Sequence, residues 1–109
     1  MKWHITFYSE KVEAETLSLP PGIVVNFLHI AELIEEFGAS LGLPYTKALG
    51  DGLFEIRAKG KEGIGRSFFC TMKGQEIIIL HSFIKKSQKT PKKELKTTQT
   101  RLKEIRKKK

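Results

Sequence analysis

The residues best suited to chemistry in this chain are cationic, and they gather where an apolar segment ends. Leu80-His81-Ser82-Phe83-Ile84 closes that segment, and five lysines follow within nine residues: Lys85, Lys86, Lys89, Lys92 and Lys93. Thr90-Pro91 is typical of a helix start, so the last two lysines fall in a first helical turn, where the helix dipole is already positive. Lysines crowded beside free backbone N–H groups indicate a phosphate-binding corner. The alternative is a set of unpaired surface lysines.

Two arginines lie on successive predicted strands upstream of this corner. Arg57 belongs to the alternating segment 53–58, and Arg66 to the segment 64–71. If the two strands pair across the connection from Gly60 to Gly63, both guanidinium groups share one face and can grip a phosphate, bidentately and with permanent charge. Either arginine could instead be a surface residue paired with Glu55 or Glu62.

The histidines and acidic residues do not form a metal site. His4, His29 and His81 have no metal-ligand spacing, and no acidic cluster suited to Mg²⁺ accompanies them. We therefore expect no metal and no cofactor. His81 is the only histidine beside the basic corner, so it is a candidate general acid or base, although a histidine hydrogen-bonded within the core is the alternative.

The net charge of +8 is concentrated at one end of the chain. Residues 85–109 hold 12 basic and 2 acidic residues, a balance of +10, whereas residues 1–84 hold 8 basic and 10 acidic residues, a balance of −2. Such asymmetry indicates a polyanionic partner: nucleic acid, most simply RNA, an anionic membrane surface or an acidic protein. A solvated tail that only aids solubility is the alternative.

Cysteine usage and apolar runs define the expected setting. The single cysteine, Cys70, lies in an apolar stretch and excludes an internal disulfide or a multi-cysteine zinc site. No apolar run approaches the ~20 residues that a membrane span requires, and the alternating first residues do not resemble a secretory signal. We expect a cytoplasmic protein without a membrane partner.

The first half of the chain predicts one strand and two helices. Trp3, Ile5 and Phe7 alternate with polar residues as in a half-buried strand, and Ser9 is placed to cap a helix over 10–17. A longer helix begins at Pro21 and ends near Gly38. Its apolar stripe is wide enough that either the first helix or a partner protein must cover part of it, and we expect the first helix to do so.

The second half predicts a small meander of strands and a basic helix. Residues 38–52, with four glycines, are interpreted as a loop. Strands over 53–58, 64–71 and 76–83 have short connections, which favours antiparallel pairing. A basic helix follows at about 91–107. The order strand-helix-helix-strand-strand-strand-helix predicts one α+β domain over residues 1–109 with an antiparallel-rich sheet.

Three segments carry a resemblance to a known family: Gly52-Leu53-Phe54-Glu55-Ile56-Arg57, then Gly65-Arg66, then Leu80 to Pro91. The chain resembles the HigB-like branch of the RelE/ParE toxin superfamily, including its phage-derived members. The resemblance implies a RelE-like fold and the toxin of a type II toxin–antitoxin system. It also implies metal-independent, 2′-OH-mediated endoribonuclease activity (an mRNA interferase) on the translating ribosome, and inhibition by a cognate helix-turn-helix antitoxin.

By position, the resemblance assigns the scissile phosphate to Arg57, Arg66 and Lys86, with Lys85 and Lys89 as neighbours able to substitute. Lys92 and Lys93 are expected to bind RNA. Glu55 departs from the best-known ribosome-dependent members, which have lysine there, and no tyrosine follows Tyr45, although some members have one near the C-terminus. The general acid and base are therefore not assigned by the resemblance.

Two other functions remain open on the sequence. One is a non-catalytic inhibitor of DNA gyrase, as on the ParE side of the superfamily, and the other is a plain nucleic-acid-binding protein. We predict that Arg66→Ala restores growth with little loss of fold, and a variant that stays fully toxic would mean that the active site is misplaced.

Overall fold

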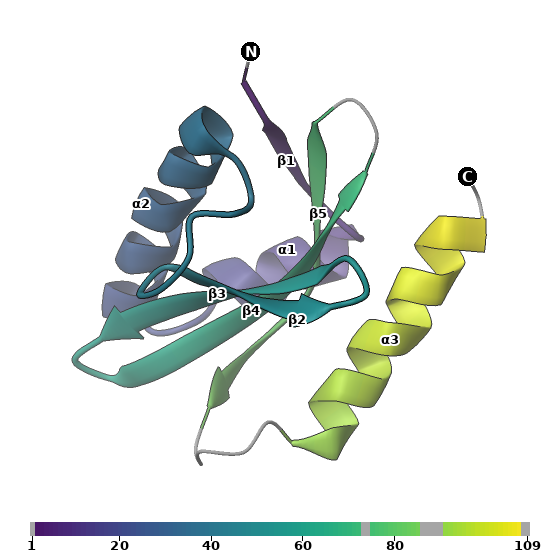
Figure 1. Ribbon diagram of the computed structural model, residues 1–109. Coiled ribbons are helices and arrows are strands. Elements are labelled where there is room, and N and C mark those ends of the chain that lie inside the picture. Colours follow the sequence, from purple (N-terminus) through teal and green to yellow (C-terminus); the bar gives the residue numbers. More distant parts are fainter. Residues whose placement is uncertain (1, 73–74, 86–90, 108–109) are drawn as a thin grey trace.

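The computed structural model describes residues 2–72, 75–85 and 91–107, which form one five-stranded sheet with helices on both faces (Figure 1). The elements are β1 (His4–Phe7), α1 (Glu10–Leu17), α2 (Pro21–Phe37), β2 (Thr46–Gly50), β3 (Leu53–Gly60), β4 (Gly63–Met72), β5 (Glu76–Lys85) and α3 (Lys92–Lys107). The strand order is β1-β5-β4-β3-β2, with β1 parallel to β5 and the other pairs antiparallel. The predicted α+β class and antiparallel-rich sheet are confirmed.

The interpretation of residues 38–52 as a loop is wrong for Thr46–Gly50, which form the edge strand β2 on β3. Thr46 is the only buried residue of this strand, so its side chains show no apolar alternation that would reveal a strand. Two of the four glycines that suggested a loop, Gly50 and Gly52, lie at the hairpin turn between β2 and β3 instead. Gly50, Asp51 and Gly52 have φ values of 91°, 59° and 78°, a region that glycine adopts without steric cost.

The predicted helix boundaries are largely confirmed. Ser9 accepts a hydrogen bond from the backbone N–H of Val12 at 3.2 Å and caps α1. Pro21 occupies the first position of α2, and Gly38, with φ 95°, ends it. Among the described residues no single helix has the length and apolar character to cross a membrane; α1 and α2 together reach both measures, with a bend of 120° between them.

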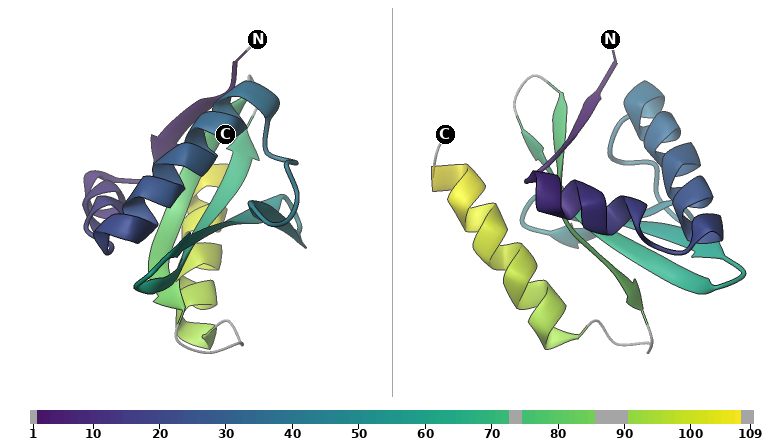
Figure 2. Two further views of the ribbon diagram at one scale, coloured as in Figure 1. Left: turned by 90° about the vertical axis from the view of Figure 1, so that its left-hand side faces the viewer. Right: turned by 180° about the vertical axis from the view of Figure 1, so that it is seen from behind.

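Helices cover the two faces of the sheet (Figure 2). Each face has its own layer of buried apolar side chains. On one face, α1 and α2 bury residues such as Val12, Ile23 and Phe27 against the sheet. On the other face, α3 packs Leu102 over Phe68 and its neighbours. The thin apolar seam of α3 is enough for this role, because only one side of that helix meets the sheet.

The wide apolar stripe of α2 is only partly covered by the rest of the protein. Ile23, Phe27, Ile30 and Ile34 are buried, whereas Leu28 is 46% exposed. A groove remains between α1, α2 and β1, and its rim carries three carboxylates, Glu13, Glu32 and Glu35. The buried part of the stripe packs on the sheet, and α1 shares only the same core, so the expectation that the first helix covers part of the stripe is not confirmed. The outer part of the stripe stays open to solvent.

A β-bulge at Leu80 determines which face the end of β5 presents. Phe69 pairs with Ile79 and Phe68 with His81, so Leu80 is an extra residue between them. Without it, strict alternation would turn Lys85 toward α1 and α2. With it, Phe83 and Lys85 lie on the α3 side of the sheet. A bulge commonly re-aims side chains in this way beside functional sites.

Gly65 sets how closely α2 approaches the sheet. A Cβ added at this position would lie 2.5 Å from Cγ2 of Ile23. We predict that Gly65→Ala lowers the free energy of unfolding by about 1–3 kcal/mol, because the added methyl group overpacks this contact. Urea denaturation measures the change. Lys59→Ala, at an exposed position on the neighbouring strand, should change stability by less than about 0.5 kcal/mol. An unchanged midpoint for Gly65→Ala would mean that α2 is not held tightly at this point.

Candidate active site

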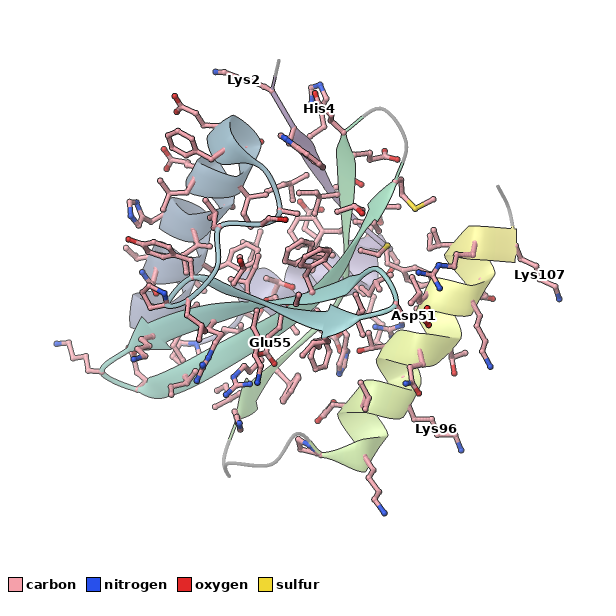
Figure 3. All side chains as sticks on the ribbon, in the orientation of Figure 1. Lys2, His4, Asp51, Glu55, Lys96 and Lys107 are labelled. Carbon is pink, nitrogen blue, oxygen red and sulfur yellow. The ribbon has the colours of Figure 1, made fainter. Side chains whose placement is uncertain are left out.

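Side chains from neighbouring strands line up on the face of the sheet that α3 partly covers. β3 and β4 pair across the connection from Gly60 to Gly63, so Arg57 is the direct cross-strand partner of Arg66. Arg66 is in turn the partner of Phe83 on β5. Glu55, two residues before Arg57 on β3, lies on the same face (Figure 3). The two predicted arginines therefore share one face.

Arg66 and Glu55 form a buried ion pair. Nη1 of Arg66 donates to Oε2 of Glu55 at 2.8 Å, and the two side chains are only 7% and 1% exposed. The other carboxylate oxygen, Oε1, and Nε of Arg66 have no partner among the residues that the structure describes. The two alternatives left by the sequence are thus both true of Arg66, which shares a face with Arg57 and also pairs with Glu55. This pairing is buried, however, rather than at the surface.

Arg57 is half-buried and less well compensated. Its backbone N–H donates to the carbonyl of Tyr45 at 2.9 Å, which fixes the strand. Its buried Nε has no hydrogen-bond partner within the described ranges. Like charges placed directly opposite each other on paired strands destabilise a sheet. The Arg57–Arg66 pairing therefore costs stability that a bound anion would restore.

Lys85 extends the positive charge of this face. The bulge turns it to the α3 side, where it is the cross-strand partner of Ile64. Partial burial and the charge of Arg66 lower the pKa of Lys85 from its usual value, Glu55 opposes that effect, and Arg57 and Lys47 add to it. Four cations therefore act around one carboxylate. We call Lys47, Arg57, Arg66 and Lys85 the basic cluster.

His81 joins the sheet to α3 rather than to the basic cluster. Its Nε2 lies 2.5 Å from Oε1 of Glu94, and its Nδ1 lies 3.3 Å from Nη1 of Arg101. Nη1 of Arg101 also donates to the carbonyl of Leu80 at 2.8 Å. Both ring nitrogens are engaged with helix residues, so a proton-transfer role would require one of these contacts to open. The acid–base role of His81 stays a prediction.

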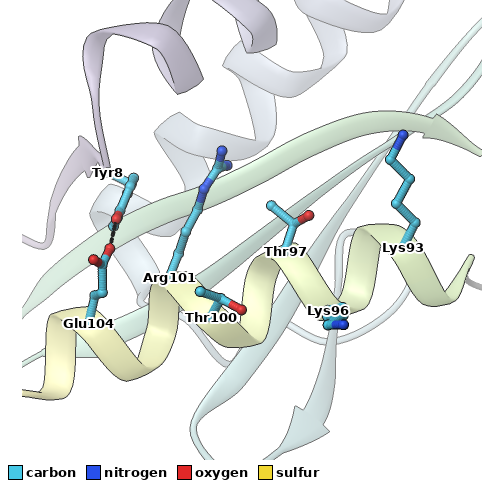
Figure 4. A pocket seen from close by; sticks show the side chains of 7 residues that line it. All are labelled: Tyr8, Lys93, Lys96, Thr97, Thr100, Arg101 and Glu104. Atoms are coloured by element: carbon cyan, nitrogen blue, oxygen red, sulfur yellow. Dashed lines mark hydrogen bonds between the residues drawn. The ribbon is translucent and has the colours of Figure 1, made fainter.

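The Arg101 side chain also fastens α3 to the start of the chain. Its guanidinium lies 5.3 Å from the ring centre of Tyr8, as expected for a cation–π contact. The Tyr8 hydroxyl donates to Glu104, which raises the pKa of that tyrosine (Figure 4). These contacts fix the distance and tilt of α3 over the sheet.

The remaining predicted lysines divide into two groups. Lys86 and Lys89 lie outside the described residues, as does Thr90, the predicted cap of the last helix. Lys92 and Lys93 are exposed in the first turn of α3, where the sequence placed them. Lys93 borders a groove that it shares with Thr97 and Arg101 (Figure 4).

Sequence reasoning missed Lys47, because its strand was interpreted as a loop. Lys47 is the cross-strand partner of Glu55. The Phe68 and Phe83 rings, 5.5 Å apart, were also not expected at the site. Burial raises the pKa of the Cys70 thiol, as expected for a structural cysteine. No group of three or more histidine, cysteine or acidic residues able to hold a metal occurs in the described ranges.

A family model described as phage derived protein Gp49-like (DUF891) matches residues 14–103. The chain belongs to this family. The matched region contains the whole basic cluster and the predicted lysines at the start of α3. Membership of the Gp49-like family confirms the resemblance to phage-derived toxins of the RelE/HigB type.

A solved structure shows the same fold. It is the crystal structure of an archaeal RelE–RelB complex from Pyrococcus horikoshii OT3, with a TM-score of 0.55, 19% sequence identity, and coverage of 77% of this chain and 96% of that chain. At this identity the likeness concerns the fold alone. No curated protein sequence matches the chain. The fold and family are those of a toxin from a toxin–antitoxin system.

The buried pair changes what an arginine substitution does to stability. Arg66→Ala leaves the Glu55 carboxylate buried without a partner, so we predict a loss of about 3–5 kcal/mol in the free energy of unfolding. Arg57→Ala removes no ion pair and relieves a like-charge contact, so its loss should stay below about 1 kcal/mol. Urea denaturation of both variants measures the contrast. Equal losses would contradict it. Because Arg66 is buried and paired, this prediction replaces the expectation from the sequence that Arg66→Ala preserves the fold.

Proposed function

We propose that the protein is the toxin of a type II toxin–antitoxin system and acts as a metal-independent endoribonuclease on mRNA. The observation that carries the proposal is the uncompensated charge of the basic cluster. Arg57 directly opposes Arg66, and Glu55, the carboxylate that acts on Lys85, is already bonded to Arg66. Opposed like charges destabilise the paired strands, and a bound phosphodiester would relieve that repulsion.

The proposed chemistry uses the 2′-OH of the RNA as nucleophile. The 2′-OH gives up its proton to solvent water as its oxygen bonds to the adjacent phosphorus. The bond from phosphorus to the 5′-oxygen breaks, and the products carry a 2′,3′-cyclic phosphate and a 5′-OH. Negative charge grows on the non-bridging oxygens during this step. Fixed guanidinium groups such as Arg57 and Arg66 stabilise that charge without reorganising, an effect typically worth about 3–4 kcal/mol for one group.

The 5′-oxygen gains a proton as it leaves, and Lys85 is the proposed donor. Its lowered pKa makes its ammonium group a stronger acid than an ordinary lysine, and it lies on the same face as both arginines. Glu55 is assigned a positioning role, because its Oε2 holds the Arg66 guanidinium at 2.8 Å. Lys86 and Lys89, which follow Lys85 in the sequence, are proposed to add phosphate contacts.

The exposed lysines of α3 are proposed to contact ribosomal RNA. Lys92, Lys93 and Lys96 are exposed along the helix. A contact made mainly through such cations weakens steeply with salt, since each neutralised phosphate releases counterions. The protein is proposed to act on translating ribosomes in the cytoplasm.

We further propose that a cognate antitoxin with a helix-turn-helix domain holds the protein inactive. Support comes from the archaeal RelE of the same fold, which was crystallised as a complex with RelB. The antitoxin is proposed to bind directly to this chain.

Expression of the chain without an antitoxin tests the activity. We expect growth arrest, with mRNA cut within translated codons and mapped by primer extension. Intact mRNA together with blocked DNA supercoiling would instead identify a gyrase inhibitor. Intact mRNA with normal supercoiling, while the protein still binds RNA, would identify a plain nucleic-acid-binding protein.

Substitutions of two cluster residues separate charge from proton transfer. We predict that Arg57→Ala lowers the cleavage rate on the order of a hundredfold with little loss of fold, because it removes one fixed cation from the transition state. Lys85→Arg keeps the charge, but a guanidinium does not release its proton at neutral pH. Lys85→Arg should therefore be much slower than the parent chain, and Lys85→Ala, which also loses the charge, should be slower still. Full activity of Lys85→Arg would restrict Lys85 to phosphate binding. Lys11→Ala, on the exposed side of α1, is the control.

A further inference from the structure

A hollow of about 280 Å³ lies beside the basic cluster, between the β2–β3 turn, the sheet and α3. Leu53 and Phe68 of the sheet form its floor, and Leu49 and Leu95 form two opposing sides. Gln99 of α3 is exposed at its edge. The lining is therefore apolar apart from one side-chain amide and the polar groups of the turn.

The hollow continues directly from the proposed catalytic face. Phe68 lies two residues beyond Arg66 on β4, a distance of about 7 Å along a strand, and faces the same side. On β3, Leu53 is likewise two residues from Glu55. If Arg57 and Arg66 hold a phosphate of the RNA, a base next to that phosphate on the same strand can reach the hollow.

The walls of the hollow are held in place from outside. Arg106 of α3 donates a hydrogen bond to the carbonyl of Asp51 in the β2–β3 turn and lies 3.8 Å from the carboxylate of the same residue. Leu49 remains 39% exposed at the rim. The hollow is therefore a preformed feature between two tethered elements, with apolar surface left open to solvent.

These properties match a nucleobase. A base has two flat apolar faces and a polar edge, and proteins that read RNA sequence commonly splay single bases into pockets, contacting the faces with apolar side chains and the edge with hydrogen bonds. Leu49 and Leu95 suit the faces. The amide of Gln99 can both donate and accept, so it suits the edge.

We infer that this hollow is a base-recognition subsite, which takes one nucleobase of the RNA next to the scissile phosphate. The inference rests on the proposed ribonuclease function and adds a source of sequence preference to it. Gln99 reads the edge of the base, and Leu49 and Leu95 hold its faces. An apolar side chain of a protein partner could pack against the floor of the hollow. It would make no hydrogen bond with the amide of Gln99 and would not be attracted by the adjacent cations.

Mapping of cut sites in translated mRNA tests the inference. Gln99→Leu keeps the size of the side chain but removes its hydrogen bonds, so the preference for one base beside the cut should fall roughly ten- to hundredfold. Cutting itself should continue, because the basic cluster is untouched. Thr100→Leu, which adds the same side chain at the next exposed position of α3, should leave the preference as it is. Leu49→Trp should fill the hollow and abolish the preference.

The outcomes separate this inference from the proposed function. If the parent chain cuts mRNA and both Gln99→Leu and Leu49→Trp keep its distribution of cut sites, the hollow is not a base subsite. If Leu49→Trp loses binding to the antitoxin while its cut sites stay the same, the hollow is a protein-docking site and the inference is overturned. If the parent chain cuts no mRNA, the ribonuclease proposal fails instead.

Discussion

The candidate site depends on one extra residue in β5. An unbroken alternation along this strand would separate the cations, with Arg57 and Arg66 on one side of the sheet and Lys85 on the other. The bulge at Leu80 reverses the alternation beyond it. The apolar side chains in the first half of β5 therefore pack into both core layers, and Phe83 and Lys85 near its end lie on the cationic face. It also exposes the carbonyl of Leu80 to Arg101, and this hydrogen bond helps to place α3. One irregularity in the sheet thus positions both the cluster and the helix beside it.

The buried pair of Arg66 and Glu55 gives this cationic face its rigidity. A guanidinium held by a carboxylate does not need to be ordered when a substrate binds, and fixed groups of this kind are what charge stabilisation requires. The same carboxylate neutralises part of the charge, so catalysis on this face would rely more on Arg57 and Lys85. The opposed arginines and the unpartnered polar atoms lower the stability of this face. A bound anion would restore that stability.

Local patterns predicted much of this fold. Ser9, Pro21 and Gly38 mark helix boundaries through their own backbone chemistry, and the alternating residues of β3 placed Arg57 on a definite face. Strand β2 escaped detection because an exposed edge strand needs no apolar alternation. The bulge escaped because Ile77 to Leu80 are all apolar, and a run without alternation contains no information about which residue is extra. The burial of Arg66 likewise depends on contacts from three strands, which spacing along one strand does not contain.

The two helical layers also make the molecule electrically asymmetric. α1 and α2 carry six glutamates and one lysine on one side of the sheet, whereas the basic cluster and α3 carry most of the cations on the other. A body of this kind behaves as a dipole, and the field of a polyanion exerts a torque on it as well as an attraction. The protein would therefore rotate as it approaches a phosphate-rich surface and arrive with the arginines foremost. A larger share of encounters would then begin in a productive orientation, without any contact having formed.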